Sequence, residues 1–337
     1  MESVKTDKKT FNKNQIRNLV IKLLPLFALI LLFAMFCIVV LANNFKLNLY
    51  LTNIINRGTV LAIVATGAIF IYTLGSFDIS LGAATLLSAT LGVLTYNGTK
   101  NTLLTVIVMF AVGIGCSLLS STLASVFRIP VFVTTVAMMS VLSAIATQII
   151  NVNGNGEAIT IPRTVFGSLN KPWIKVIFIV LWLAICFFIF EFTKIGRRQK
   201  FLGANPFCAK LTGISLNKYA IIAFAMAGCS VGIGALMTLS YTPNVTTGTA
   251  SSIGMDILVA IVFGGMPISG GPRSKIYSAV VGGFSYVLLT TTLSIILRSA
   301  GVAGQGSDGI SQIISAVFFL AVVLVAGFNH RSKNLPR

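Results

Sequence analysis

Long apolar runs separated by short polar segments dominate this chain. A helix that spans the hydrocarbon core of a bilayer needs roughly 20 mostly apolar residues, and ten runs approach that length. These runs cover residues 23–42, 58–74, 79–96, 102–127, 129–150, 173–190, 219–241, 252–266, 276–297 and 310–328. The second, third and eighth are short and rich in glycine. The pattern predicts an all-α polytopic membrane protein with about ten transmembrane helices and broken, Gly-rich segments.

The same pattern defines the domain organisation. Residues 23–328 form a single transmembrane domain, between a basic N-terminal tail (1–22) and a short C-terminal tail (329–337). Within the domain, the loop 193–218 is basic and interrupts the apolar runs. The outer loop 151–171 is too short for a domain but long enough for a small extracellular platform.

The distribution of charge predicts the orientation of the spans. With the N-terminus inside and the ten spans alternating, 18 of the 25 Lys and Arg residues fall on the cytoplasmic side. Cytoplasmic loops carry the basic excess, so we expect both termini to be cytoplasmic. The remaining basic residues fall in outer loops or at outer helix ends, and they are Lys46, Arg57, Lys100, Arg163, Lys171, Lys175 and Arg298. On this assignment no Arg or Lys lies in the middle of a span.

The composition of the chain excludes several classes of protein. Only 9% of the residues are charged, against about 25% in a soluble domain, and the mean hydropathy is +0.93. The net charge of +18 sits at the ends of apolar runs and in loops, without the basic face of a nucleic-acid-binding protein. Five scattered Cys and a single His, His330, leave no basis for a metal centre or a hydrolytic triad.

A short helix is predicted inside the basic loop, beginning after Asn205. Asn205 suits the N-cap, Pro206 suits the first helical position, and Gly213 suits the left-handed residue that ends a helix. The helix has only about two turns, too few to span a membrane. A separately capped helix on the surface of a membrane protein is typical of a subunit that another protein drives. The chain has no P-loop motif, so in an ATP-driven system the ATPase is a separate polypeptide.

Two Gly-rich breaks interrupt the spans, at residues 75–82 and 264–271, and both fit Gly-x-x-x-Ile-Ser-x-Gly. Broken helices at membrane depth are tolerated inside protein or beside a water-filled cavity, and they often mark the route of a solute. The glycines that we expect to break the helices are Gly75, Gly82, Gly264, Gly265, Gly270 and Gly271.

Asp78 and Asp256 are the two acids closely flanked by apolar sequence. A carboxylate in the membrane is costly and needs a reason. Either each acid stabilises the first turn of the helix that follows, or each contacts the solute. Asp78, Ser80, Asp256, Thr66 and Tyr72 are the candidate residues of a translocation path.

Three blocks together resemble the permease subunits of bacterial ATP-binding cassette importers of the ribose and simple-sugar type. Residues 75–82 resemble the family's Gly-Gly-Ile-Asp-Leu-Ser-Val-Gly block. Residues 203–214 resemble its Gly-Asn-x-x-Ala-Ala-x-x-Ser-Gly-Ile block, and residues 248–271 resemble its Gly-x-x-x-Asp-x-Ile-Ala-Ala-Val-Val-Leu-Gly-Gly stretch. The chain departs from the family pattern at Pro206-Phe207, at Cys208 and around Met266-Pro267.

The resemblance implies partners and roles. The second block of the family is a coupling helix that sits in a groove of the ATPase, and the role passes to Asn205, Pro206, Phe207, Ala209, Lys210, Leu211 and Gly213. The resemblance also implies a second permease, an extracellular or periplasmic substrate-binding protein, and location in the bacterial inner membrane. This chain would hold no cofactor itself, and ATP and Mg²⁺ would bind the partner ATPase.

These observations predict a transport subunit, not an enzyme, that translocates a monosaccharide-like neutral solute. A nucleoside importer of the same superfamily is the close alternative. A proton-coupled secondary carrier is the alternative from a different class, with Asp78 and Asp256 as its proton sites. Whether the two permeases are identical stays open.

Overall fold

The computed structural model describes residues 13–154, 156–250, 252–266, 270–271 and 274–300, together with residues 310, 313, 314, 317 and 320. The first part of the predicted N-terminal tail, most of the predicted tenth span (310–328) and the C-terminal tail therefore lie outside the described residues.

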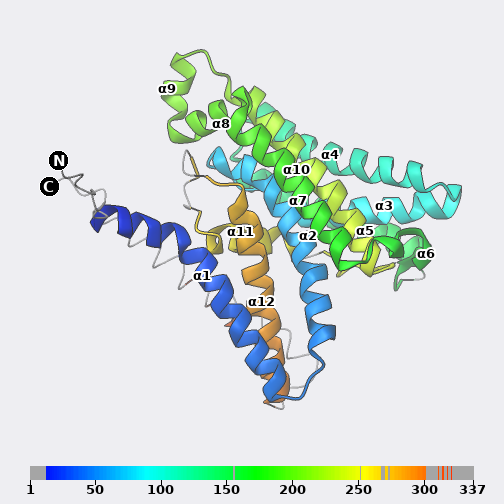
Figure 1. Ribbon diagram of the computed structural model, residues 1–337. Coiled ribbons are helices and arrows are strands. Elements are labelled where there is room, and N and C mark those ends of the chain that lie inside the picture. The colour runs from blue at the N-terminus through cyan, green and yellow to red at the C-terminus, as the bar shows by residue number, and fades with distance from the viewer. Residues whose placement is uncertain are drawn as a thin grey trace, which may run out of the picture.

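Helices account for nearly all of the described structure (Figure 1). The long helices are α1 (Lys13–Ala42), α2 (Leu47–Thr73), α3 (Leu81–Thr99), α4 (Thr102–Phe127), α5 (Val131–Asn153), α7 (Pro172–Phe192), α10 (Leu216–Tyr241) and α12 (Tyr277–Ser299). The shorter elements are β1 (Ile159–Thr160), α6 (Arg163–Phe166), the 3₁₀ helix η1 (Gly167–Leu169), α8 (Lys194–Ala204), α9 (Pro206–Leu211), β2 (Asn244–Val245) and α11 (Ile253–Phe263). The prediction of an all-α polytopic membrane protein is confirmed.

Seven of the described helices are long and apolar enough to cross a membrane, namely α1, α2, α4, α5, α7, α10 and α12. The predicted third span corresponds to α3, which has 19 residues and is not among these seven helices. The predicted eighth span corresponds to α11, which has only 11 residues. At 1.5 Å per residue, α11 is about 16 Å long, roughly half the thickness of the hydrocarbon core.

The predicted start of the second span was wrong by eleven residues, because α2 begins at Leu47 and not at 58. The segment from Leu47 to Arg57 contains polar residues that interrupt the apolar run in the sequence. They do not interrupt the helix, whose backbone hydrogen bonds continue through them. Arg57 is therefore an interior residue of α2 instead of a flanking residue.

The centre of the bundle consists of α2 and α10, with α3 and α12 beside them. In the most apolar part of α2, 83% of the residues are buried, and in α10 67%, compared with 17% in α1. Small residues let the central helices approach closely. A Cβ on Gly113 of α4 would lie 2.7 Å from the carbonyl oxygen of Gly228, and one on Gly232 would lie 2.9 Å from the Cα of Phe110. This small-x-x-x-small pattern on α10 is typical of helix packing in membranes.

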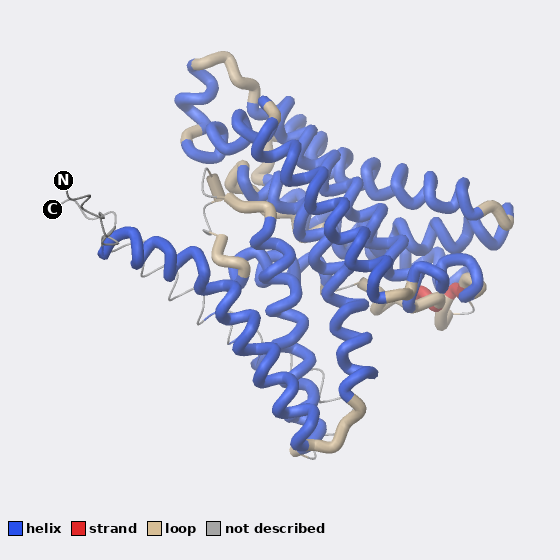
Figure 2. Tube along the Cα trace, in the orientation of Figure 1, coloured by secondary structure: helices blue, strands red, loops and turns tan. Residues whose placement is uncertain are grey.

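The two ends of the bundle differ in structure. In Figure 1, α8 and α9 lie at the upper left and the beginning of α1 lies at the left, whereas α6 and the loop after α3 lie at the right and the loop after α1 lies at the bottom. At the right, β1 and β2 form a small antiparallel sheet in which Ile159 pairs with Val245 (Figure 2). Asn97, at the end of α3, donates a 3.0 Å hydrogen bond to the carbonyl oxygen of Thr160. The described residues of the loop 151–171 thus form a small platform over the ends of α3 and α10.

Candidate functional site

Helix α9 has the caps that its sequence predicts. The side-chain oxygen of Asn205 accepts a hydrogen bond of 3.1 Å from the backbone amide of Cys208, and Pro206 occupies the first turn. At the other end, Gly213 has φ 78° and its amide donates to the carbonyl oxygen of Lys210. The amide of Ile214 donates to the carbonyl oxygen of Ala209, which closes the helix.

One face of α9 is unusually apolar for an exposed surface. Phe207 is 72% exposed and Leu211 is 74% exposed, and Lys210 beside them is exposed too. The opposite face carries Ala209, which is fully buried in a small cluster with Leu202 of α8. Residues three and four positions apart share a helix face, so α9 presents an apolar and basic surface outward.

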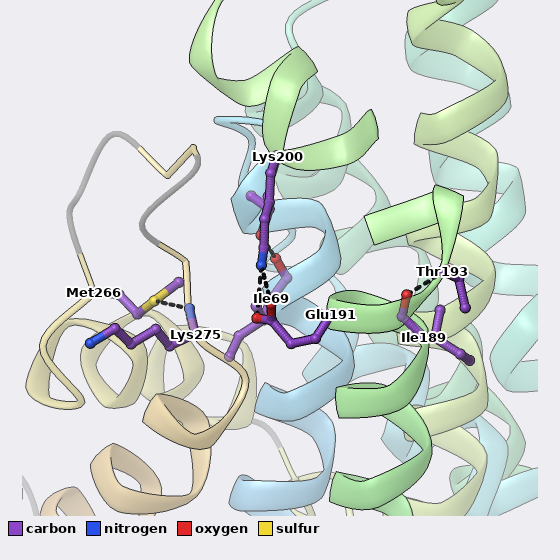
Figure 3. A network of polar contacts seen from close by, with 8 residues as sticks. Ile69, Ile189, Glu191, Thr193, Lys200, Met266 and Lys275 are labelled. Atoms are coloured by element: carbon purple, nitrogen blue, oxygen red, sulfur yellow. Dashed lines mark hydrogen bonds and ion pairs between the residues drawn. The ribbon is translucent and has the colours of Figure 1, made fainter. Parts of the chain in front are cut away.

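Helix α8 is fixed to the bundle by polar contacts with its neighbours. Lys200 reaches toward Glu191 at the end of α7 and pairs with it at 2.7 Å (Figure 3). The same ammonium lies 4.4 Å from the ring centroid of Phe190. Arg198 donates a 2.7 Å hydrogen bond to the hydroxyl of Tyr219 on α10. Helix α8, on which α9 packs, is therefore connected to both α7 and α10.

Three segments that are distant in the sequence meet beside α8. Gly203, in the last turn of α8, lies directly against the carbonyl group of Thr73 at the end of α2, and a Cβ on Gly203 would lie 3.0 Å from the Cα of Gly271. The amide of Gly271 donates a 3.0 Å hydrogen bond to the Thr73 carbonyl oxygen. Gly270 lies against the carbonyl oxygen of Tyr72. We call this contact of Gly203, Thr73, Gly270 and Gly271 the glycine junction.

The first Gly-rich break lies between α2 and α3. Gly75 has φ 77°, and its amide donates to the carbonyl oxygen of Tyr72, which ends α2. The next helical residue is Leu81. Thr135 of α5 holds the intervening segment, because its hydroxyl lies 3.4 Å from the carbonyl oxygen of Phe77 and from the amide of Ile79.

Asp78 is buried within this break and stabilises the start of α3. One carboxylate oxygen accepts a 2.8 Å hydrogen bond from the amide of Ser80 and a 2.6 Å hydrogen bond from its hydroxyl. Of the two interpretations of Asp78, this geometry supports the capping interpretation. The other carboxylate oxygen is buried and has no hydrogen-bond partner among the described residues.

The two other path candidates on α2 are buried inside the bundle. The hydroxyl of Thr66 donates to the carbonyl oxygen of Ala62 in its own helix. The ring of Tyr72 packs edge-on against Phe77 with centroids 5.0 Å apart, and no described residue hydrogen-bonds its buried hydroxyl. Neither side chain faces an open surface in this conformation.

The second Gly-rich break follows α11. Gly264 lies against the backbone of Ser278, and Gly265, with φ 81°, lies against Pro25 of α1. The amide of Lys275 approaches the sulfur of Met266 at 3.1 Å, which closes the two ends of the break toward each other (Figure 3). Gly270 and Gly271, at the end of this break, lie beside α8 because they belong to the glycine junction.

Asp256 lies in the first turn of α11. Its carboxylate accepts hydrogen bonds of 2.8 Å from the hydroxyl of Tyr286 on α12 and from the hydroxyl of Ser252. The starts of α3 and α11 meet inside the bundle, since a Cβ on Gly82 would lie 2.7 Å from the amide nitrogen of Gly254. The structure thus brings together the first turns of two short or interrupted helices, each with a carboxylate beside it.

Sequence reasoning missed Lys175, which it placed at an outer helix end. Lys175 is only 1% exposed, and its ammonium donates to the side-chain oxygens of Asn56 and Asn170. It also lies 5.2 Å from the ring centroid of Tyr241. Asn56 is 119 residues away in the sequence, so no local pattern could have indicated this contact.

The fold defines the class of the protein as a polytopic, all-helical membrane protein. A family model described as the permease component of the branched-chain amino acid transport system matches residues 50–327. The chain therefore belongs to this family of transport permeases, and it is a transport component and not an enzyme.

Several curated proteins are similar over most of their length. The ribose import permease of Escherichia coli K12 is 24% identical over 84% of this chain and 87% of its own. The ribose import permease of Bacillus subtilis is 23% identical over 96% of this chain and 97% of its own. The fructose import permease of Rhizobium meliloti is 25% identical, over 83% and 79% respectively.

Proposed function

We propose that this chain is the membrane-spanning subunit of an ATP-driven importer that carries a monosaccharide-like neutral solute into a bacterial cell. It would act beside a second permease, with a cytoplasmic ATPase that binds ATP and Mg²⁺ and an extracellular binding protein that delivers the solute. The observation that carries the proposal is the exposed apolar and basic face of α9, formed by Phe207, Lys210 and Leu211 on a firmly anchored support.

The anchoring explains how a movement of the ATPase would reach the bundle. Helix α9 packs on α8 through Ala209 and Leu202, and α8 is attached to α7 and α10 through Lys200 and Arg198. A push on α9 is therefore transmitted to these helices instead of being absorbed by a loose loop. The glycine junction passes the same displacement to the end of α2 and to the break after α11.

The two interrupted helices would form the route of the solute. Helix N-termini and unwound backbone offer weak polar contacts inside a membrane, and weak contacts permit release. The first turns of α3 and α11 supply both features at one place in the bundle. Selectivity would come mainly from the binding protein, so the path need not hold the solute tightly.

The orientation follows from the same reasoning. Since α9 would contact a cytoplasmic ATPase, the beginning of α1, which lies on the same side, would be cytoplasmic as well (Figure 1). The platform formed by β1, β2, α6 and η1 would then face the outside, where a binding protein docks. This orientation agrees with the excess of basic residues in the inner loops.

Reconstitution tests the proposal. The chain is incorporated into vesicles with the ATPase and the binding protein encoded beside it, and uptake of radiolabelled ribose, fructose and uridine is measured with and without ATP. We expect sugar uptake that needs ATP and all components. Preferred uptake of uridine would assign the chain to nucleoside import. Uptake by the chain alone under a proton gradient would contradict the ATP-driven mechanism.

A further inference from the structure

One face of α8 is exposed and basic. Its first cation is followed three and four positions later by two more, so all three share this face of the helix. We call these exposed residues the basic stripe, and they are Lys194, Arg197 and Arg198. The opposite face of α8 is buried and carries Gly196, Gln199 and Leu202. Because the buried face packs on the bundle, the basic stripe points away from the helices that hold α8.

The basic stripe begins where α7 leaves the membrane. Helix α7 has 21 residues and is about 31 Å long, which matches the roughly 30 Å of the hydrocarbon core. Near its end, Phe188 and Phe192 are exposed and their rings stack with centroids 5.8 Å apart, as expected for contact with lipid. Lys194 follows Phe192 by two residues, which is at most about 7 Å along the chain. Lys194 therefore lies in the headgroup layer beside the core.

Helix α8 stays in this layer instead of projecting from it. A helix that continued along the axis of α7 would carry Lys200 about 13 Å beyond Glu191. The ammonium of Lys200 instead pairs with Glu191 at 2.7 Å and lies 4.4 Å from the ring centroid of Phe190 (Figure 3). At the other end of α8, Gly203 lies against the carbonyl group of Thr73, the last residue of α2. Both ends of α8 are thus held at the ends of transmembrane helices, at the level of the headgroups.

Two cations of the basic stripe have no counter-charge in the described part of the chain. Arg198 donates to the hydroxyl of Tyr219, but neither Lys194 nor Arg197 forms a hydrogen bond or an ion pair with any described residue. The acids that the structure describes are bonded to other groups or lie in the loop 151–171, and they are Asp78, Glu157, Glu191 and Asp256. The counter-charge of the stripe therefore comes from another molecule.

We propose that the basic stripe of α8 binds the headgroups of anionic phospholipids in the membrane leaflet on the side of α9. The inference goes beyond the proposed function, which places this leaflet in contact with the cytoplasm. The planar guanidinium of Arg197 donates two parallel hydrogen bonds to a headgroup phosphate, and the ammonium of Lys194 acts as a point charge beside it. The exposed ring of Phe192 contacts the acyl chains of the same lipids.

The character of the surface distinguishes a lipid partner from the ATPase. The proposed ATPase contact is the apolar face of α9, where Phe207 and Leu211 accompany a single cation, Lys210. The basic stripe has three cations, with no exposed aliphatic side chain between residues 194 and 198, and it begins beside a lipid-facing ring. Basic segments next to the membrane are attracted by anionic lipids, with a gain of about fivefold in binding for each Lys or Arg.

Lipid retention by the full chain tests the basic stripe. The protein is placed in nanodiscs of equal parts phosphatidylglycerol and phosphatidylcholine with the same acyl chains, and the lipids that stay bound are counted by native mass spectrometry. We expect the wild type to prefer phosphatidylglycerol. The preference should fall about fivefold in Lys194→Gln or Arg197→Gln, and about twentyfold or more in the double variant. Lys194→Arg combined with Arg197→Lys keeps both charges and should keep the preference.

Lys210→Gln is the matched control, because it removes an exposed cation from α9 and should keep the lipid preference. A wild type without a preference for phosphatidylglycerol, or an equal preference in the double variant, would overturn the inference. So would displacement of the bound lipid by soluble glycerol phosphate, which would indicate a site for a free anion.

Co-purification of the ATPase separates the lipid from the other candidate partner. If the double variant keeps its phosphatidylglycerol but loses the ATPase, the basic stripe belongs to the ATPase interface and the inference is wrong. If it loses the lipid preference and keeps the ATPase, the inference is supported. ATP-dependent uptake by the wild type tests the importer by itself, so the two proposals fail separately.

Discussion

The backbone amide of Gly271 donates a hydrogen bond of 3.0 Å to the carbonyl oxygen of Thr73, the last residue of α2. This bond joins the break after α11 to the break after α2. Gly203 of α8 packs against the same carbonyl group, so the support of α9 meets both breaks at one point. A movement of α9 therefore has a short physical route to the two interrupted parts of the bundle.

A side chain at Gly203 should disturb this junction. A Cβ at this position meets the backbone of Thr73 and Gly271, and backbone cannot rotate away as a flexible side chain can. We expect Gly203→Val to lose about 1–3 kcal/mol of stability through overpacking and to separate ATP hydrolysis from uptake. Thermal unfolding in detergent and the ratio of uptake to ATP hydrolysis in vesicles measure the two effects.

Gly98→Ala is the control for Gly203→Val. No atom lies within 4 Å of a Cβ at Gly98, which is in the last turns of α3. This variant should unfold at the same temperature as the wild type or slightly higher, since alanine favours the helix. An equal loss of stability in both variants would show that the junction is not tightly packed.

The exposed face of α9 gives a second prediction. Phe207→Asp places a charge where we expect an apolar contact with the ATPase. Ala209 packs α9 against the bundle, whereas Phe207 is exposed. The permease should therefore fold normally but bind the ATPase more weakly. Co-purification of the ATPase should fall about tenfold or more, the usual effect of removing a large aromatic anchor from an interface.

The matched control introduces the same charge into the same loop. Leu216, the first residue of α10, is exposed, and an acid in the first turn of a helix is favourable. Leu216→Asp should retain the ATPase. If Phe207→Asp also retains the ATPase and transports sugar at the normal rate, α9 is not the contact.

Asp78 allows the capping and proton-site interpretations to be separated. Asparagine keeps an oxygen that accepts a hydrogen bond from Ser80, whereas alanine removes it. We expect Asp78→Ala to lose about 0.5–2 kcal/mol of stability, as other N-terminal cap deletions do, and Asp78→Asn to lose much less. ATP-dependent uptake by Asp78→Asn should remain close to that of the wild type. Abolished uptake in a stable Asp78→Asn variant would favour the proton-site interpretation instead.

Local chemistry explains which features the sequence could predict. The bounds of α9 follow from Asn205, Pro206 and Gly213, whose capping roles depend on the chain within a few residues. The start of α2 could not be predicted from apolar length, because tertiary packing extends the helix through a polar segment that ends at Arg57. That Asp256 and Thr66 line a solute path stays a prediction; Asp256 is partly exposed, whereas Thr66 is buried.

The burial of Lys175 leads to the last prediction. Its ammonium donates to the side-chain oxygens of Asn56 and Asn170, and these bonds join α2 and the loop 151–171 to α7. Lys175→Met keeps the volume and removes the donors, so two amide oxygens lose a partner at about 1–3 kcal/mol each where water does not replace it. We expect a clear fall in the unfolding temperature, measured in detergent.

Lys171→Met is the control, since Lys171 is exposed at the start of the same helix and its substitution should change stability by no more than about 0.5 kcal/mol. If Lys175→Met and Lys171→Met unfold at the same temperature, the desolvation cost of the buried ammonium equals the stability gained from its hydrogen bonds. In that case stability would no longer explain the burial of Lys175.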